Sequence, residues 1–281
     1  MNKTEIKAMI SLLDDSDEDV ALHIERRIVS LGEGIIPFLE EEWEETLNPD
    51  LQKKIEDLIH NLQFGGLMHR LREWKQEDDP DLLKGLWLVN SYLYPDVEYG
   101  TITQAMDQLY FDAWTHMKNE MHPFDQVKSL NNVIFREKKF SANTKNFHSP
   151  ANSMLHLVLE TKRGNPLTLC VIYMIIAKRL EMPVYGVNLP NLFILTYKMD
   201  GIQFYINVYN KGLILSKADI DNYILQLNLN PVDIFYEPCT NLDIIRRALR
   251  NLAFSFEKMD DLDKAAEVTK LLEAISDDTA V

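Results

Sequence analysis

The apolar residues of the first 75 positions recur about every 3.6 residues, which is the spacing of one face of an α-helix. Two such faces carry Ile6, Met9, Ile10 and Leu13, and then Val20, Ile24, Ile28 and Leu31. Gly32 is expected to end the second helix, while Pro37 and Pro49 are expected to open a third and a fourth. The pattern predicts four short helices joined by polar turns.

Helical spacing continues beyond Pro80 and brings a cluster of aromatic residues with it. Tyr110 and Phe111 lie four and three positions before Trp114, so the three residues share one side of a predicted helix. Large aromatic side chains at this spacing usually belong to a core. We therefore expect all three to be buried.

Residues 149–177 predict two consecutive helices, the first over about 150–162. Asn165 and Pro166 suit the N-cap and the first position of the second helix. Residues 167–177, LTLCVIYMIIA, are almost continuously apolar. A helix without a polar face is buried on all sides, so this segment is expected to be the central helix of a domain, with Cys170 near its start.

Short β-rich segments follow the apolar helix. They cover residues 184–189, 192–198, 202–209 and 213–215. Asp200 with Gly201 is a hairpin signal between the second and third segments, and residues 210–212 are another between the third and fourth. The sequence therefore predicts an antiparallel sheet packed on a buried helix that carries a cysteine.

Charge divides the chain into unlike parts. The 29 Lys and Arg against 44 Asp and Glu give a net charge of −15. Residues 1–127 contribute −16, residues 128–217 contribute +8 and residues 218–281 contribute −7. The acidic flanks argue against nucleic acid as a partner. The basic segment 128–217 would either bind an anion or dock on those flanks.

The remaining composition points to a soluble cytoplasmic protein. The 46% of hydrophobic residues suffice for a buried core, and no apolar stretch has the length of a signal peptide or a membrane span. The two cysteines, Cys170 and Cys239, are too few for a disulfide scaffold. We expect no cofactor, no metal site and no membrane partner.

A cysteine near a helix start, followed by antiparallel strands, is the arrangement in which papain-like and transglutaminase-like enzymes build a Cys-His-Asp triad. The residues strengthen this likeness. The segments FREKKFSAN (135–143), SPANSMLHLVLETKRGNPLTLC (149–170) and RLEMPVYGVNLPNLFIL (179–195) resemble the bacterial SirB-type transglutaminase-like proteins. The resemblance covers about residues 82–281 and implies a tetratricopeptide-like helical pair near the carboxyl end. Its inner faces would carry Leu249, Leu252, Ala253 and Phe256, and Ala265, Ala266, Val268 and Leu271.

The same resemblance weakens an enzymatic interpretation. Cys170 falls at the nucleophile position, but the base position is Leu192 and the orienting position is Asn207. Leucine cannot accept a proton, so only a displaced base, His148 or His156, could activate the thiol.

The resemblance also implies a cleft, and four residues of its motifs are candidates to line it. These are Asn152, Arg163, Asn165 and Asn191.

Two hypotheses about function follow. The first is a non-catalytic transglutaminase-like protein that acts as a binding or regulatory module, with a protein or peptide partner. The alternative is a cysteine hydrolase or acyltransferase that uses Cys170 with a displaced histidine base. The sequence leans toward the first, because the base position has no histidine, and it defines no oligomeric state.

The expected architecture is α+β and predominantly helical, with a papain/transglutaminase-like core and a small antiparallel sheet flanked by α-helical repeats. Residues 1–78 would form HEAT-like hairpins, residues 79–225 the core, and residues 226–281 the tetratricopeptide-like pair.

Overall fold

The computed structural model describes residues 3–15, 17–118 and 120–276. The chain separates into two compact units, Met1–Arg70 and Leu71–Val281. Each unit is described here by itself. The division of the chain into three domains stays a prediction.

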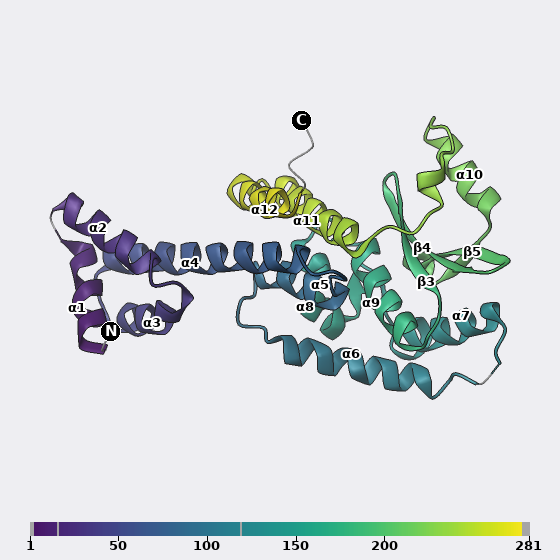
Figure 1. Ribbon diagram of the computed structural model, residues 1–281, viewed down its shortest axis with the longest axis horizontal. Helices are drawn as coiled ribbons and strands as arrows, with labels where there is room; N and C mark the ends of the chain where they lie inside the picture. The colour runs from purple at the N-terminus through teal and green to yellow at the C-terminus, as the bar shows by residue number, and fades with distance from the viewer. Residues whose placement is uncertain (1–2, 16, 119, 277–281) are drawn as a thin grey trace. The chain divides into compact units, whose positions relative to one another are not determined.

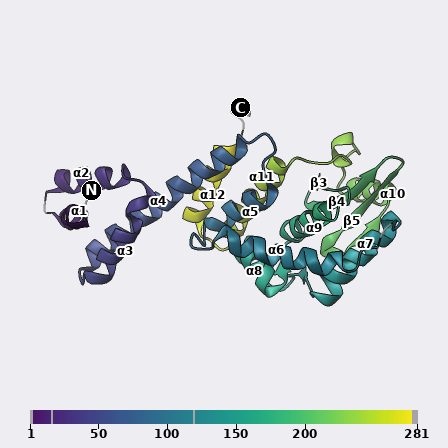
Figure 2. The same cartoon turned by 60° about the horizontal axis from the view of Figure 1, so that its bottom comes forward.

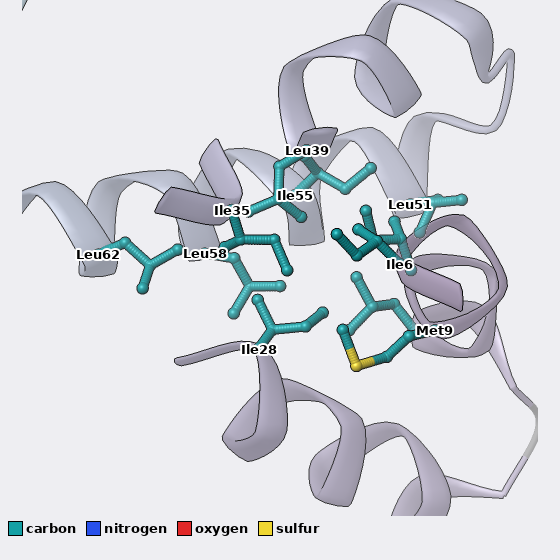
Figure 3. Close-up of a cluster of buried hydrophobic side chains, with 11 residues drawn as sticks. Ile6, Met9, Ile28, Ile35, Leu39, Leu51, Ile55, Leu58 and Leu62 are labelled. Carbon is teal, nitrogen blue, oxygen red and sulfur yellow. The ribbon is translucent and has the colours of Figure 1, made fainter. Parts of the chain in front are cut away.

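Four helices with one shared core make up the first unit (Figure 1). They are α1 (Lys3–Ser11), α2 (Glu18–Val29), α3 (Ile36–Glu45) and the part of α4 (Pro49–Lys75) that precedes Leu71. Figure 3 shows Ile and Leu side chains from these helices converging around Ile55 and Leu39, both fully buried. Burying one such side chain stabilises a fold by about 1.5–3 kcal/mol, so this cluster holds the four helices together.

The inward face of α2 differs from the predicted one. Val20 and Leu31 are both 36% exposed, whereas Ala21 and Ile28 are buried. Leu31 lies outside the helix, because α2 ends at Val29 rather than at Gly32. Gly32 instead occupies a left-handed conformation, with φ 71°, at the start of the next turn.

The fourth helix was predicted to be short, but it runs for 27 residues. It continues through Gly65 and Gly66, although glycine is a poor helix former. Gly66 has a tertiary role there, because a Cβ atom at this position would clash with the Glu33 carboxylate. That carboxylate pairs with Arg70 at 2.7 Å, so a glycine lets the loop before α3 pack on α4.

The second unit contains most of the helices. They are the end of α4, α5 (Leu82–Ser91), α6 (Tyr99–Trp114), α7 (Pro123–Asn131), a π-helical turn (Asn132–Glu137), a 3-10 turn (Pro150–Ser153), α8 (Leu155–Thr161), α9 (Pro166–Arg179), α10 (Lys217–Gln226), a 3-10 turn (Asp233–Phe235), α11 (Asn241–Lys258) and α12 (Leu262–Ile275). Helix α9 contacts α5, α6, α8 and α11 as well as the strands, which makes it the centre of this unit (Figure 2).

A four-stranded antiparallel sheet packs beside α9. Its strands lie in the order β3 (Val184–Leu189), β4 (Leu192–Met199), β5 (Ile202–Asn207) and β6 (Leu213–Leu215). The predicted hairpin turn is present at Gly201, whose φ is 75°. The predicted strand 202–209 stops at Asn207, because Val208–Asn210 forms a 3-10 turn that the Asn207 side chain caps.

The sequence pattern did not predict the local structure at three places. The predicted helix 150–162 is broken at Met154, whose backbone is extended, so a 3-10 turn precedes α8. Arg163–Gly164 does more than end a helix, since it forms β2 and pairs in parallel with β1 (Ser141–Ala142). The helix α10 was not predicted at all, although Ser216 and Asp219 form a capping box at its start.

Two predicted core positions lie on the surface instead. Phe111 is 61% exposed and Trp114 is 55% exposed, because α6 buries the opposite stripe that contains Met106 and Ala113. In the carboxyl-terminal hairpin of α11 and α12, Ala265 faces inward as predicted, but its neighbour Ala266 is exposed.

The predicted fold class is confirmed: the chain is mostly helical and carries one small antiparallel sheet. Within the described residues, no helix combines the length and the hydropathy that crossing a bilayer requires.

Candidate functional site

Helix α9 starts as the sequence predicts and is buried along its length. The Asn165 side chain caps it by accepting a hydrogen bond from the Thr168 amide at 2.9 Å. Pro166 occupies the first turn, where its missing N–H leaves no intrahelical bond unmade. Every residue from 167 to 177 is buried, so the helix is the core element on which the site is built.

Cys170 lies inside this core and has no access to solvent. Its exposed fraction is 0%, and its Sγ lies 3.6 Å from the carbonyl oxygen of Phe193, to which it donates a weak hydrogen bond. Burial raises the pKa of the Cys170 thiol well above its usual range, because an apolar interior disfavours the thiolate. The group is therefore a neutral thiol at physiological pH.

The side chain at the predicted base position points away from α9. Leu192 packs with Ile194, Ile220 and other residues of a cluster on the sheet face that α10 covers. Side chains alternate along a strand, so Phe193 lies on the opposite face, where it shares a pocket lining with Pro166 and Leu167 of α9. Figures 1 and 2 both place α9 and α10 on opposite sides of the strands. The structure does not bring Leu192 and Cys170 together.

Asn207, at the predicted orienting position, performs a local structural task. Its side-chain oxygen accepts a hydrogen bond from the Asn210 amide at 3.1 Å. Its backbone carbonyl accepts another from the Gly212 amide at 2.9 Å. These bonds close the turn between β5 and β6, and no hydrogen bond of the described residues joins Asn207 to a histidine.

His156 is engaged elsewhere. Its Nδ1 is 2.7 Å from Oδ1 of Asn90, a fully buried residue of α5, and its ring packs edge-on against Tyr94 with centroids 4.4 Å apart. Burial lowers the pKa of His156, which favours the neutral imidazole. In the part of the chain that the structure describes, no hydrogen bond connects His156 with Cys170.

His148 lies at the rim of a pocket rather than next to the thiol. Its ring makes edge-on contacts with Phe147 and Phe254, with centroids 5.1 Å and 5.7 Å apart. Buried Asn152 holds the preceding loop, because its side-chain amide donates to the carbonyls of Asn146 and Phe147 at 2.7 Å and 3.0 Å. Asn152 thus positions a wall of the pocket.

This pocket is formed where the amino end of α9 meets the β3–β4 turn and α11. We call it the α9 pocket. It has a volume of about 100 Å³ and is lined by Phe147, His148, Asn165, Pro166, Leu167, Asn191, Phe193, Arg247, Asn251, Phe254 and Ser255.

Two of the four predicted cleft residues line the α9 pocket. Asn165 and Asn191 do so, and Asn191 adopts a left-handed backbone conformation, with φ 57°, in the β3–β4 turn. Asn152 lies behind the pocket as a loop anchor, and Arg163 lies on the surface in β2. That these four residues form a functional cleft stays a prediction.

Sequence reasoning missed Arg247, the cation of the pocket. Its Nη1 donates to the carbonyl of Leu189 at 2.8 Å and to the side chain of Asn188, and its guanidinium lies 5.7 Å from the centre of the Phe193 ring. Burial lowers the pKa of this guanidinium. Arg247, Asn251 and Ser255 are spaced by four residues and so share one face of α11, which is the signal that could have found them.

Basic residues of segment 128–217 pair with acids from the flanking segments. Arg179 lies 2.6 Å from Asp107, and Lys198 lies 2.5 Å from Glu237. Lys138 pairs with Asp112 in the same way. These contacts are partly exposed, so each contributes little to stability, but they satisfy part of the positive charge within the fold.

The α9 pocket offers no metal chemistry from its own side chains. Within the described residues, no three His, Cys, Asp or Glu side chains gather as metal ligands would. Its polar groups are amides, a hydroxyl, an imidazole and a guanidinium, which bind and orient a ligand by hydrogen bonds and charge.

The comparisons with known proteins agree with this architecture. Residues 100–250 match the model of the transglutaminase-like superfamily. A UPF0162 protein of Xylella fastidiosa is 26% identical over 193 residues, which cover 62% of this chain and 64% of that protein. F-box only protein 21 of Homo sapiens is 21% identical over 276 residues, covering 85% of this chain and 43% of that protein. The chain thus spans less than two thirds of the length of these relatives. No solved structure matches the chain.

Proposed function

Because the chain belongs to the transglutaminase-like superfamily, we propose that it is a non-catalytic member that acts as a binding or regulatory module. The likeness to UPF0162 proteins supports a place among the SirB-type proteins. The helices α1 to α4 would serve as HEAT-like hairpins and the α11–α12 hairpin as a tetratricopeptide-like pair, two arrangements that typically present surfaces to peptides and proteins.

The environment of Cys170 carries this proposal. A cysteine nucleophile needs a thiolate and a base within hydrogen-bonding distance. Cys170 is fully buried, its thiol faces a backbone carbonyl, and burial favours its protonated form. Such a residue behaves as a small apolar core side chain.

The α9 pocket supports a binding function rather than a catalytic one. The α9 pocket is adjacent to the helix that carries the thiol, and its lining includes Phe193, which is 1% exposed, but not Cys170. A ligand in the pocket would therefore meet amides, aromatic rings and Arg247, and not the sulfur atom.

Alkylation of Cys170 tests the proposal. The Cys239→Ser variant leaves Cys170 as the single cysteine of the chain, and its reaction with iodoacetamide at pH 7.5 would be compared with that of a free thiol. We expect the native protein to react at least about 100-fold more slowly, because the fully buried thiol is protected until the fold opens. In denaturant the same variant should react like the free thiol.

Two histidine variants complete this experiment. His148→Ala and His156→Ala, each combined with Cys239→Ser, should leave the slow rate unchanged. A reaction faster than that of the free thiol, abolished by either histidine change, would overturn the proposal in favour of a cysteine hydrolase or acyltransferase with a displaced base.

A further inference from the structure

Arg247 is a half-buried cation in the lining of the α9 pocket. Within the described residues, none of its contacts is with a carboxylate: its acceptors are a backbone carbonyl and the amide oxygen of Asn188. Taking a charge out of water is unfavourable, and these neutral partners compensate for it only in part. A guanidinium beside a pocket, with only neutral partners, suggests that the ligand supplies the negative charge.

The guanidinium also has hydrogen-bond donors to spare. Both of its hydrogen bonds use Nη1, whereas Nε and Nη2 donate to no described residue. Neither atom is fully buried without a partner, so each keeps some solvent-accessible surface. The Nε–H and Nη2–H pair of an arginine is the edge that binds the two oxygens of a carboxylate.

The other walls of the α9 pocket favour an anion too. The eleven described residues that line it include no Asp or Glu. The amino end of α9, a helix of 14 residues, lies at the same pocket and adds the positive end of its dipole.

The size and the rim of the pocket limit what the anion is attached to. A volume of about 100 Å³ is well below the roughly 300 Å³ at which pockets begin to hold drug-sized ligands, so only a terminal group can enter. In its lining, Phe147 and Phe254 are both 47% exposed, and an apolar or aromatic group next to the anion would pack on their rings.

We propose that the α9 pocket binds a carboxylate carried by an apolar or aromatic body, with Arg247 as its principal ligand. The peptide carboxyl terminus with a large apolar last residue fits this description best, since its carboxylate and side chain are one residue apart. A single cation suits a singly charged carboxylate better than a phosphate dianion. This inference rests on the proposed function, because it assigns a ligand class to the pocket of a binding module.

Titration calorimetry of the full chain at pH 7 and low salt tests the inference. The probes are N-acetyl-glycyl-phenylalanine and the same peptide with an amidated carboxyl end. We expect the acid to bind at least about 10-fold more tightly than the amide, as loss of a charge-assisted pair would require. Phenylacetate is the third probe: equal affinity would identify a free acid as the natural source of the carboxylate, and weaker binding a peptide end.

Variants of α11 locate the binding to Arg247. Arg247→Gln should lower the affinity for the acid at least about 10-fold, whereas Arg250→Gln removes the same charge from an exposed residue of that helix and should change it less than about 2-fold. Asn251→Asp is a second test of Arg247 that remains valid if Arg247→Gln fails to fold. It would place a carboxylate four residues after Arg247, supply the missing counter-ion within α11, and so compete with the ligand.

The neutral change Asn251→Ala separates charge from shape. It removes one amide of the pocket lining and should lower the affinity, but by less than Asn251→Asp, which loses at least about 10-fold. The inference is overturned if the amide binds as well as the acid, or if Asn251→Asp binds the acid as wild type does. Its failure is distinct from that of the proposed function, because a hyper-reactive Cys170 would contradict the latter while leaving carboxylate affinity in place.

Discussion

Cys170 and Arg247 both contact Phe193, yet their surroundings are opposite. Cys170 touches the Phe193 carbonyl from within the core and has an exposed fraction of 0%. Arg247 lies over the Phe193 ring, is half-buried, and keeps donors open to a pocket. Cysteine is the residue type that suggests chemistry, but Cys170 is buried in the core. Arg247, which lines a pocket, belongs to an ordinary amphipathic helix.

This difference shows that residue type and access must be judged separately. A cysteine near a helix start is a nucleophile only if the first turn of the helix is open to solvent. Here that turn is occupied by Asn165 and Pro166, and Cys170 is the fifth residue of the helix. One additional turn of depth is enough to convert a candidate nucleophile into a core residue.

Removing the Phe193 ring should have the largest effect on this comparison, because Phe193 contacts both residues: its carbonyl accepts from Cys170 and its ring lies next to Arg247. Phe193→Ala deletes a ring that is 1% exposed, and changes of this kind cost about 3–5 kcal/mol. Urea unfolding should show a loss of this size. Iodoacetamide should also reach Cys170 faster in the folded variant, since the lost ring leaves a cavity at the residue whose carbonyl accepts from the thiol.

Phe204→Ala is the matched control. Phe204 is 4% exposed and lies on the same sheet face, where it stacks on Tyr197 at 5.1 Å, away from the α9 pocket. It should destabilise the protein to a similar extent. Equal acceleration of Cys170 alkylation in both variants would mean that general opening of the fold, and not the loss of the Phe193 ring, controls access to the thiol.

Much of this core could be predicted from local signals. Asn165 and Pro166 mark the start of α9, its unbroken apolar run marks its burial, and the turn residues delimit β3 to β6. Each of these features depends on neighbours in the sequence, so the pattern contains the information.

The rest depends on contacts between distant segments. Whether Arg247 meets a carboxylate is decided by α9 and the β3–β4 turn, more than 50 positions away, and no local pattern encodes it. The length of α4 also depends on a distant contact, because the glycine at position 66 is needed only where Glu33 packs on the helix. Phe111 and Trp114 are exposed because α6 turns its other apolar stripe toward the core. Spacing alone cannot tell which of two apolar stripes will face inward.

A second, smaller effect is expected at Asn165, which supports both environments because it caps α9 and lines the pocket. Asn165→Ala removes the cap and should lower the free energy of unfolding by about 1–2 kcal/mol in urea. Asn165→Asp retains a capping oxygen and should keep most of the stability. If both variants lose the same amount, the cap is not what stabilises this end of the helix.

The smallest effect concerns His156, the histidine that the fold keeps away from Cys170. Its pKa is lower in the folded chain than the usual 6.5, because burial disfavours the charged ring. Its contribution to stability is therefore complete above about pH 6.5 and declines as the pH falls toward the folded pKa, since the unfolded chain takes up the proton first.

His156→Gln removes this titration. The urea midpoint of the variant should change less between pH 7 and pH 5.5 than that of the wild type. A wild-type midpoint that rises on acidification, or an identical slope in both proteins, would contradict the assignment.

The central claim is that this core acts through the charge at Arg247 and not through the thiol at Cys170. The most direct measurement is the affinity of Cys170→Ala and of Arg247→Gln for N-acetyl-glycyl-phenylalanine, determined by calorimetry under identical conditions. We predict that Cys170→Ala binds within about 2-fold of wild type and that Arg247→Gln binds at least about 10-fold more weakly. Loss of binding in Cys170→Ala together with full affinity in Arg247→Gln would contradict the account.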